Sequence, residues 1–347
     1  MTKKITIGVL IIIGLLFVSM YKAVPQVKIS DHFNGKKFIN PTLEKPFSPS
    51  MGDIFKMMRE GRPKWQSNIQ NTAVPRLKDT LNTGDFSITF INHATFLIQT
   101  GDLNIITDPV FSKRASPVSW FGPKRVRKPG VELDSLPRID LILLSHNHYD
   151  HLDKKTLKKL GERHNPKVLV PIGDKKLVES CGFKNVQEMN WWENVELNGN
   201  TIITFTPQQH SSARNLLDRD KSLWGSFYIQ SHGRRIYFGG DGGYSTHFKD
   251  IKNKLGSPEL AILGIGAYVP DFFMKAIHTS PAEAVTAHLD LGATQSIGMH
   301  FGTFQLASEG FEQPTEDLKT AMLKNNLSDD CFIVMQEGET KFYRNKK

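Results

Sequence analysis

Three histidines and one aspartate lie within six residues of this chain, at His146, His148, Asp150 and His151. Imidazole and carboxylate groups at this spacing are typical metal ligands, whereas neighbouring imidazoles in a solvated turn gain nothing from one another. A His-x-His-x-Asp-His motif is expected by chance about once in a thousand chains with this histidine content. The motif therefore predicts the metal centre of an enzyme.

Three further donors follow singly, at His210, Asp241 and His300. Seven donors are too many for one tetrahedral ion, but they suit two ions that share a carboxylate. A set of imidazoles and carboxylates without thiolate favours zinc, although iron or manganese would also accept it. Glycines on both sides of Asp241 permit a tight turn that brings the backbone close to a ligand. We therefore expect a dinuclear site, with two zinc ions as the first choice.

The donors follow segments that are expected to be strands. Residues 139–144 form a short apolar run, the pattern of a strand buried on both faces, and the motif begins where this run ends. Strands are likewise predicted before the single donors, at residues 201–206, 235–238 and 296–299. Helices are predicted at residues 153–162, with Asp153 as the cap, and at 174–181 and 281–291. The sequence thus predicts mixed α/β structure with ligands in the loops after strands.

The order of these donors resembles that of the metallo-β-lactamase superfamily, in which an αββα sandwich is expected. Within the superfamily, the chain resembles the N-acylphosphatidylethanolamine-hydrolysing phospholipase D family from about Asn92 to Glu339. The segments that carry this resemblance are Gly-Pro-Lys-Arg at 122–125, Ser-His-Asn-His-Tyr-Asp-His-Leu-Asp at 145–153, Leu-Trp-Gly-Ser at 223–226 and His-Phe-Gly-Thr-Phe at 300–304. Several of these segments are not required for metal binding, so the resemblance concerns the substrate as well as the fold.

The resemblance assigns a role to each donor. It implies one zinc ion bound by His146, His148 and His210 and a second bound by Asp150, His151 and His300, with Asp241 bridging the two. It also implies that Asp108 supports the metal ligands through hydrogen bonds, as outer carboxylates commonly do. His278 matches a histidine of the family's active-site region, where it would contact substrate or assist proton transfer. The implied catalytic residues are therefore Asp241, Asp150 and His278.

The implied reaction is zinc-dependent hydrolysis of N-acylphosphatidylethanolamine to N-acylethanolamine and phosphatidic acid. In it a metal-bridging hydroxide would attack phosphorus. The alternative is another hydrolase on the same scaffold, such as a lactonase, thioesterase or phosphodiesterase, because a fold and a metal pair do not fix the reaction. A zinc-binding module without turnover would need an incomplete metal site, and all seven donors are present.

Composition and the N-terminus bear on location. Residues 5–21 are uncharged and largely apolar and follow Lys3 and Lys4, which predicts a single-pass membrane anchor, or a signal-like segment, within residues 1–24. The charge pattern favours a catalytic domain on the non-cytoplasmic side. Residues 25–80 are expected to form an arm or linker and residues 81–347 one hydrolase domain.

The net charge of +9 fits either nucleic acid or anionic lipid. The predicted anchor favours a membrane surface and a phospholipid substrate, without nucleic acid as a partner. The basic residues considered for lipid contact are Lys113, Arg114, Lys124, Arg125, Arg127 and Lys128. The resemblance also implies a homodimer. The two cysteines, Cys181 and Cys331, are too few and too far apart for a disulfide framework or a thiolate metal site.

Overall fold

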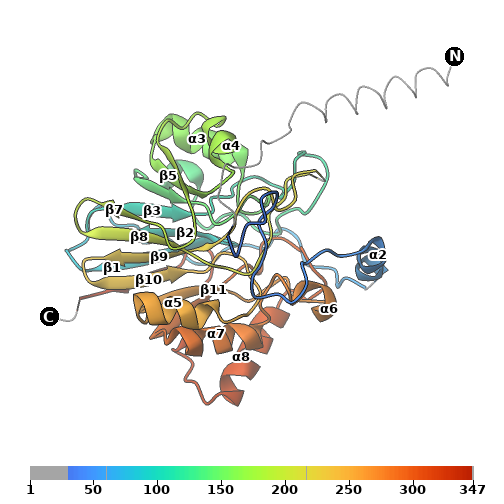
Figure 1. The fold of residues 1–347 in the computed structure, drawn as a ribbon. Helices are drawn as coiled ribbons and strands as arrows, with labels where there is room; N and C mark the ends of the chain where they lie inside the picture. Colours follow the sequence, from blue (N-terminus) through green and yellow to red (C-terminus); the bar gives the residue numbers. More distant parts are fainter. Residues whose placement is uncertain (1–29, 60, 216, 346–347) are drawn as a thin grey trace.

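The computed structural model describes residues 30–59, 61–215 and 217–345, and these contain two seven-stranded sheets (Figure 1). The first sheet has the order β14-β1-β2-β3-β4-β5-β6 and the second the order β13-β12-β11-β10-β9-β8-β7. Strands of the first sheet are β1 (Phe86–Asn92), β2 (Thr95–Gln99), β3 (Asn104–Thr107), β4 (Leu141–Leu143), β5 (Lys167–Pro171), β6 (Val186–Met189) and β14 (Thr340–Tyr343). Strands of the second are β7 (Asn194–Leu197), β8 (Thr201–Thr206), β9 (Ser226–Ser231), β10 (Arg234–Phe238), β11 (Leu260–Gly264), β12 (Gln295–Met299) and β13 (Phe332–Ile333).

Helices cover the outer faces of both sheets (Figure 1). The helices of the described residues are α2 (Met51–Arg59), the 3-10 helix η1 (Leu133–Ser135), α3 (Lys154–Arg163), α4 (Lys175–Glu179), α5 (His247–Leu255), α6 (Asp271–Met274), α7 (Pro281–Leu291) and α8 (Gln313–Lys324). Apolar residues of α3 and α4 pack on the first sheet, and those of α5, α7 and α8 pack on the second. The predicted αββα sandwich is therefore confirmed.

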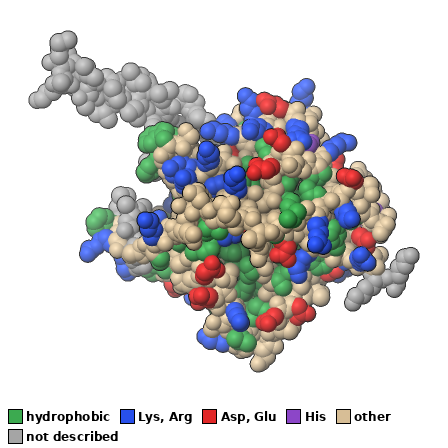
Figure 2. Space-filling model, turned by 180° about the vertical axis from the view of Figure 1, so that it is seen from behind, with side chains coloured by type: hydrophobic (Ala, Val, Ile, Leu, Met, Phe, Trp, Pro, Cys, Tyr) green, Lys and Arg blue, Asp and Glu red, His purple; other side chains and the backbone are tan. Residues whose placement is uncertain are grey.

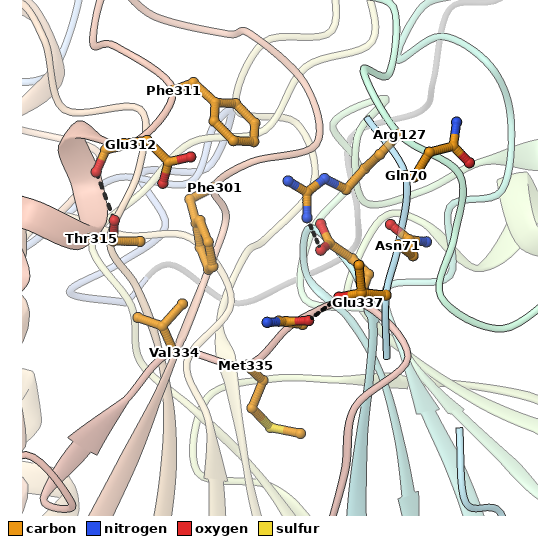
Figure 3. A pocket seen from close by; sticks show the side chains of 12 residues that line it. Gln70, Asn71, Arg127, Phe301, Phe311, Glu312, Thr315, Val334, Met335 and Glu337 are labelled. Atoms are coloured by element: carbon orange, nitrogen blue, oxygen red, sulfur yellow. Dashed lines mark hydrogen bonds and ion pairs between the residues drawn. The ribbon is translucent and has the colours of Figure 1, made fainter. Parts of the chain in front are cut away.

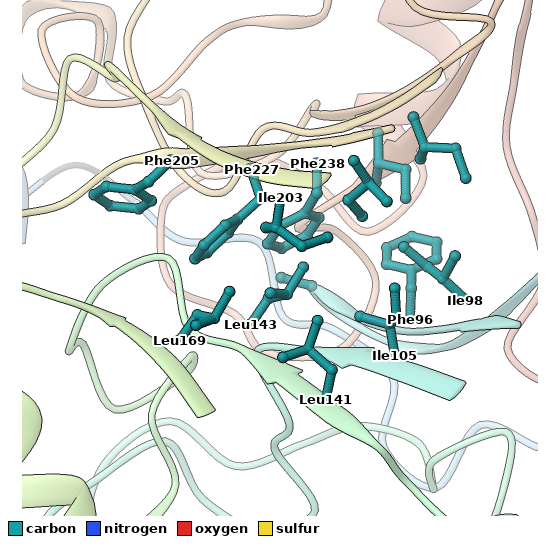
Figure 4. Packing of buried hydrophobic residues seen from close by; sticks show 14 of the residues in the cluster. Phe96, Ile98, Ile105, Leu141, Leu143, Leu169, Ile203, Phe205, Phe227 and Phe238 are labelled. Atoms are coloured by element: carbon teal, nitrogen blue, oxygen red, sulfur yellow. The ribbon is translucent and has the colours of Figure 1, made fainter. Parts of the chain in front are cut away.

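Alternation along single strands builds the layers of this sandwich. In β4, Leu141 and Leu143 face the space between the sheets, while Ile142 joins the apolar cluster under α3 and α4. Figure 4 shows Leu141 and Leu143 opposite side chains such as Phe205 and Phe227 of the second sheet. Because successive side chains of a strand point to opposite faces, an unbroken apolar run fills both layers at once. This confirms the two-sided burial predicted for residues 139–144, although regular strand structure is limited to Leu141–Leu143.

The other predicted elements lie close to their expected positions. The strand predicted at 201–206 is β8, and those at 235–238 and 296–299 lie within β10 and β12. The helix predicted at 281–291 is α7, and that at 174–181 is the shorter α4. Helix α3 begins after Asp153, whose carboxylate accepts a hydrogen bond from the amide of Lys155 as a helix cap.

Parts of the N-terminal arm pack against the sandwich. Phe33 and Phe38 are almost fully buried and belong to the apolar cluster between the sheets. Further along, the indole of Trp65 donates a hydrogen bond of 3.0 Å to the carbonyl of Glu309. Within the described ranges, no helix combines the length and apolar character needed to cross a bilayer. The predicted anchor at residues 1–24 lies outside these ranges and stays a prediction.

Candidate metal centre

The predicted donors meet at one edge of the sandwich because the strands that precede them point the same way. Strands β3, β4 and β5 of the first sheet are parallel, as are β10, β11 and β12 of the second. Strand β8 also runs in the direction of β10, since both are antiparallel to β9. The carboxyl ends of such strands share an edge, where ligand sites of open α/β sheets usually lie. Asp108, the His146–His151 motif, His210, Asp241 and His300 all follow these ends.

Asp241 lies at the centre of the cluster. Its Oδ2 atom is 2.9 Å from Nε2 of His300 and 3.1 Å from Nε2 of His151. The same oxygen is 4.0 Å from Nε2 of His146 and 3.9 Å from Nε2 of His210. One carboxylate oxygen thus approaches imidazoles of both predicted ligand sets, as a bridging group must.

The remaining donors form two groups around this aspartate. His146, His148 and His210 offer ligand atoms that lie within 4.8 Å of one another, and the Nε2 of His210 is 3.2 Å from the Nδ1 of His148. Asp150, His151 and His300 form the second group, which also includes His93. The Oδ2 of Asp150 is 3.3 Å from His300 and 3.5 Å from His151, measured to each Nε2. The structure thus brings all seven predicted donors together. Ligand atoms of His146, His151 and Asp108 also lie within 4.8 Å of one another, as do those of His210, Asp241 and His278.

Outer hydrogen bonds orient three of the imidazoles. The Nδ1 of His151 lies 2.7 Å from Oδ2 of Asp108, and the Nδ1 of His210 lies 2.7 Å from the carbonyl of Ile277. The Nδ1 of His146 contacts the hydroxyl of Ser145 at 2.9 Å. With Nδ1 engaged in this way, each Nε2 points into the cluster and is free to bind a metal.

Unsatisfied polar atoms show that this cluster fits metal ions. The Nε2 atoms of His146 and His151 and the Oδ1 atom of Asp241 are buried and have no hydrogen-bond partner. Buried polar atoms are nearly always paired, so three unpaired polar atoms in one cluster need an explanation. Imidazole nitrogen and carboxylate oxygen are the donors that zinc, iron and manganese accept.

Burial and mutual charge set the protonation of the cluster. Burial lowers the pKa of His146 and His210 well below the usual range, and neighbouring imidazoles lower it further. Burial alone would raise the pKa of Asp241, but His151 and His300 hold it well below the usual value. Conversely, burial opposes a proton on His300, yet Asp241 and Asp150 raise its pKa to about 9. Without metal, His300 therefore carries a proton and a positive charge beside the carboxylates of Asp241 and Asp150.

His278, the predicted substrate or proton-transfer residue, lies at the edge of the cluster before α7. Its Nδ1 is 3.8 Å from Oδ2 of Asp241, and its ring centroid is 5.2 Å from that of His210. Burial lowers the pKa of His278 to about 3, so its ring is neutral near neutral pH. A neutral imidazole can accept a hydrogen bond from substrate or water, but a pKa this low makes it a weak base that retains a proton only transiently.

Sequence reasoning missed two residues that contact the cluster. His93, in the turn between β1 and β2, places Nε2 3.0 Å from Oδ2 of Asp150. Asn40, in the N-terminal arm, donates from Nδ2 to the carbonyl of His210 at 2.7 Å and accepts from the His210 amide at 3.1 Å. Neither residue belongs to a local motif, and Asn40 is 170 positions from its partner.

The turn at Asp241 also explains why glycine follows it. A Cβ atom at Gly242 would lie 2.1 Å from the side chain of Gln208. The Gln208 amide fills this space and donates a hydrogen bond of 2.9 Å to the carbonyl of Gly239. Gln208 therefore occupies the room that a larger residue at position 242 would need.

Two members of the predicted basic cluster are partly buried and bonded within the fold. Arg125 is partly buried and donates to the carbonyls of Ser112 and Val110, both at 2.9 Å. Arg127 points into a separate cavity of about 270 Å³, where it forms an ion pair with Glu337 (Figure 3). Their charges are used within the fold because buried guanidinium groups need such acceptors.

Comparison with known proteins places this geometry in a family. A beta-lactamase superfamily domain matches residues 103–301. The N-acyl-phosphatidylethanolamine-hydrolyzing phospholipase D 1 of Caenorhabditis elegans is 37% identical over an alignment of 332 positions, which covers 88% of this chain and 92% of the nematode protein. The chain belongs to this phospholipase D family of the metallo-β-lactamase superfamily.

Other relatives agree with this family membership. The mitochondrial N-acyl-phosphatidylethanolamine-hydrolyzing phospholipase D of Saccharomyces cerevisiae is 39% identical over 247 residues, 70% of this chain and 52% of the yeast protein. The fold is similar to that of Igni18, a metallo hydrolase from Ignicoccus hospitalis, with a TM-score of 0.58 and 21% identity over 76% of this chain and 100% of that one. The protein is therefore a metal-dependent hydrolase that acts on phosphodiester bonds.

Proposed function

We propose that this protein is a zinc-dependent phospholipase D that cleaves N-acylphosphatidylethanolamine to N-acylethanolamine and phosphatidic acid. The observation that carries the proposal is the position of Asp241, whose Oδ2 atom lies between a His146/His148/His210 set and an Asp150/His151/His300 set. The proposed substrate comes from the nematode and yeast relatives, both of which are named for hydrolysis of this lipid.

When bound, two zinc ions supply Lewis acidity toward phosphoryl oxygens and lower the pKa of water. The chain itself supplies rigid geometry, since the outer hydrogen bonds of Asp108 and Ile277 hold the imidazoles in one orientation. The ligand loop is fixed from behind by Arg214, whose Nη1 donates to the carbonyls of Asn147 and Leu152, both at 2.8 Å. Such preorganisation avoids reorganisation of the site during the reaction.

We propose that His278 transfers a proton during the reaction. Hydrolysis forms a bond between a water oxygen and phosphorus, breaks the bond from phosphorus to the ethanolamine oxygen, and moves one proton to that leaving oxygen. The neutral ring of His278 is close to Asp241 and 11% exposed, so it can relay the proton of the water to the leaving oxygen. Its pKa of about 3 makes it a weak base, so it would carry this proton only transiently.

The surface beside the ligand loop has the amphiphilic character that a phospholipid requires. A cavity of about 1110 Å³ has Tyr149 and Asp153, which flank the second ligand set in sequence, in its wall. The other lining groups include the cations Lys113, Arg114, Lys154, Lys155 and Lys159 and the apolar side chains Phe111, Val118, Leu133, Leu177 and Leu217. Apolar surface suits acyl chains, while the cations suit phosphate.

Exposed aromatic side chains occur close to this cavity in the sequence. Trp120 and Phe121 are 77% and 69% exposed and follow the cavity residues Pro117 to Ser119. On the face shown in Figure 2, Lys and Arg side chains gather beside exposed hydrophobic side chains. Aromatic rings next to cations favour the interface of an anionic bilayer, so we propose that this side of the protein contacts the membrane. The anchor at residues 1–24, the non-cytoplasmic location and the homodimer stay predictions.

The test is incubation of zinc-loaded protein with N-acylphosphatidylethanolamine in mixed micelles, with product identification by mass spectrometry. Release of N-acylethanolamine and phosphatidic acid is expected, and the Asp241→Asn variant should release neither. If the protein cleaves a generic phosphodiester but not N-acylphosphatidylethanolamine, the proposed substrate is wrong and the assignment as a phosphodiester hydrolase stands. Hydrolysis of an acyl lactone or a thioester alone would overturn both.

A further inference from the structure

We propose that His93 is a positioning residue of this metal centre: it donates a hydrogen bond from Nε2 to Asp150 and thereby fixes Asp150 relative to His300. The inference rests on the proposed metal site, but it does not depend on the identity of the substrate. It concerns the second ligand set, Asp150, His151 and His300.

The side chain of His93 is in contact with every member of this set. Its Nε2 lies 3.0 Å from Oδ2 of Asp150. Its ring centroid is 4.0 Å from that of His300 and 5.4 Å from that of His151. The imidazole is 1% exposed, so solvent does not compete for the hydrogen bond to Asp150.

The backbone of His93 is tied to the loop that carries His300. The His300 amide donates to the carbonyl of His93 at 2.9 Å, and the His93 amide donates to the hydroxyl of Thr303 at 3.0 Å. His93 also has a φ of 49°, in the left-handed region that residues other than glycine adopt infrequently. One residue therefore connects the turn before β2, the loop after β12 and the carboxylate of the ligand motif.

The environment of the ring favours Nε2 as the atom that carries the proton. Nδ1 is buried without a hydrogen-bond partner, and the ring stands edge-on to Phe304 with centroids 5.4 Å apart. A proton on Nδ1 would leave a buried donor unpaired, whereas a proton on Nε2 meets the Asp150 oxygen. As a donor, His93 restrains the carboxylate without taking a place among the ligands, which is how outer groups orient metal ligands.

Two substitutions separate this role from the alternatives. Glutamine can place an amide donor close to the position of Nε2, so His93→Gln should bind two equivalents of zinc as the unmodified protein does. Leucine cannot donate, so His93→Leu should bind one of the two ions about 10- to 100-fold more weakly. The measurements are metal content, competition with a chelator, and the absorption spectrum of the cobalt-substituted protein. The matched control is His288→Leu, which removes another buried histidine; His288 lies on α7 and is hydrogen-bonded to Ser296 of β12.

Each outcome of these measurements either supports or overturns the proposed role of His93. Unchanged zinc affinity and an unchanged cobalt spectrum in a folded His93→Leu variant would overturn the proposal. Equal losses in the Gln and Leu variants would also overturn it, since the imidazole itself would then be required as a ligand. If the Leu variant does not fold, nitrogen-15 spectra of the zinc-loaded native protein give the answer: a neutral Nε2–H tautomer of His93 is expected, and an Nδ1–H or zinc-bound ring would contradict the proposal. A native protein that binds two ions but leaves the lipid intact would refute the proposed substrate without touching this inference.

Discussion

Asp108 and His151 are joined by a fully buried hydrogen bond of 2.7 Å between Oδ2 and Nδ1. Asp108 also accepts from the amide and the hydroxyl of Ser145, at 2.8 Å and 2.6 Å. One carboxylate behind the cluster thus fixes a ligand of the second set and the residue that precedes His146. This relationship connects the end of β3 with the end of β4, and the first prediction rests on it.

Replacement of Asp108 by asparagine should weaken metal binding by about 10- to 100-fold. The amide would turn one acceptor into a donor in a pocket where every facing group donates, and His151 would lose its orientation. Chelator competition on the purified protein measures the change. Asp134→Asn, at a carboxylate that is 93% exposed, is the control and should bind metal normally. Native affinity in the Asp108→Asn variant would contradict a supporting role.

Asn40→Ala should impair the first ligand set, although residue 40 lies far from it in sequence. The substitution removes both hydrogen bonds to the His210 backbone and leaves polar groups unpaired, at a cost of about 1–3 kcal/mol. Thermal unfolding measures the loss of stability, and competition with a chelator measures the loss of zinc affinity. Asn34→Ala, which removes side-chain bonds to the amides of Lys36 and Lys37 in the same arm, should reduce stability without a change in affinity. Equal affinities in the two variants would exclude a role for the arm at the site.

Metal uptake should release protons at neutral pH. The pKa of His300 is about 9 without metal, so its ring is protonated below that pH, and a metal ligand must be deprotonated. The apparent affinity should therefore rise by about tenfold per pH unit for this proton until about pH 9. Calorimetry in buffers of different ionisation enthalpy counts the released protons.

Deprotonation of His300 should lower the stability of the metal-free protein, although it raises the affinity for metal. A pKa raised above the usual histidine value of 6.5 contributes stability that is present below pH 6.5 and is lost as the pH rises through about 9. The pKa of His151 is also raised, because the carboxylates of Asp241, Asp150 and Asp108 outweigh the effect of burial. Uptake without proton release at neutral pH would show that His300 and His151 are already neutral.

Trp120→Ser combined with Phe121→Ser should weaken binding to anionic vesicles and leave cleavage of a short-chain, water-soluble substrate unchanged. Full burial of one large apolar side chain contributes about 1.5–3 kcal/mol, so partial insertion of two rings predicts a loss of about 10- to 100-fold. Vesicle sedimentation measures the fraction of protein bound to vesicles, and high salt should reduce this fraction further. The control is Leu323→Ser on α8, where the side chain is 64% exposed. Native vesicle binding by the double variant would move the membrane contact elsewhere.

Local sequence was sufficient for the elements that carry the ligands. The apolar run that ends at Leu144 predicts a strand with two buried faces, and Asp153 predicts the start of α3, because strand burial and helix capping depend on residues a few positions apart. Seven donors placed after such strands then predict the site, since the carboxyl ends of co-directional strands share one edge.

Tertiary structure alone decided which distant residues complete that site. His93 lies in the turn between β1 and β2, and Asn40 lies in the N-terminal arm, where its neighbours form no helix or strand. Nothing within a few residues of either position indicates a ligand loop. Arg125 and Arg127 likewise look like surface charge in the sequence, but in the fold they are partly buried and bonded to other groups of the chain. Sequence patterns reflect hydrogen bonds and burial among residues that are a few positions apart. The contact of His93 with Asp150 spans 57 residues and exists only once strands β1 to β4 have assembled in the first sheet.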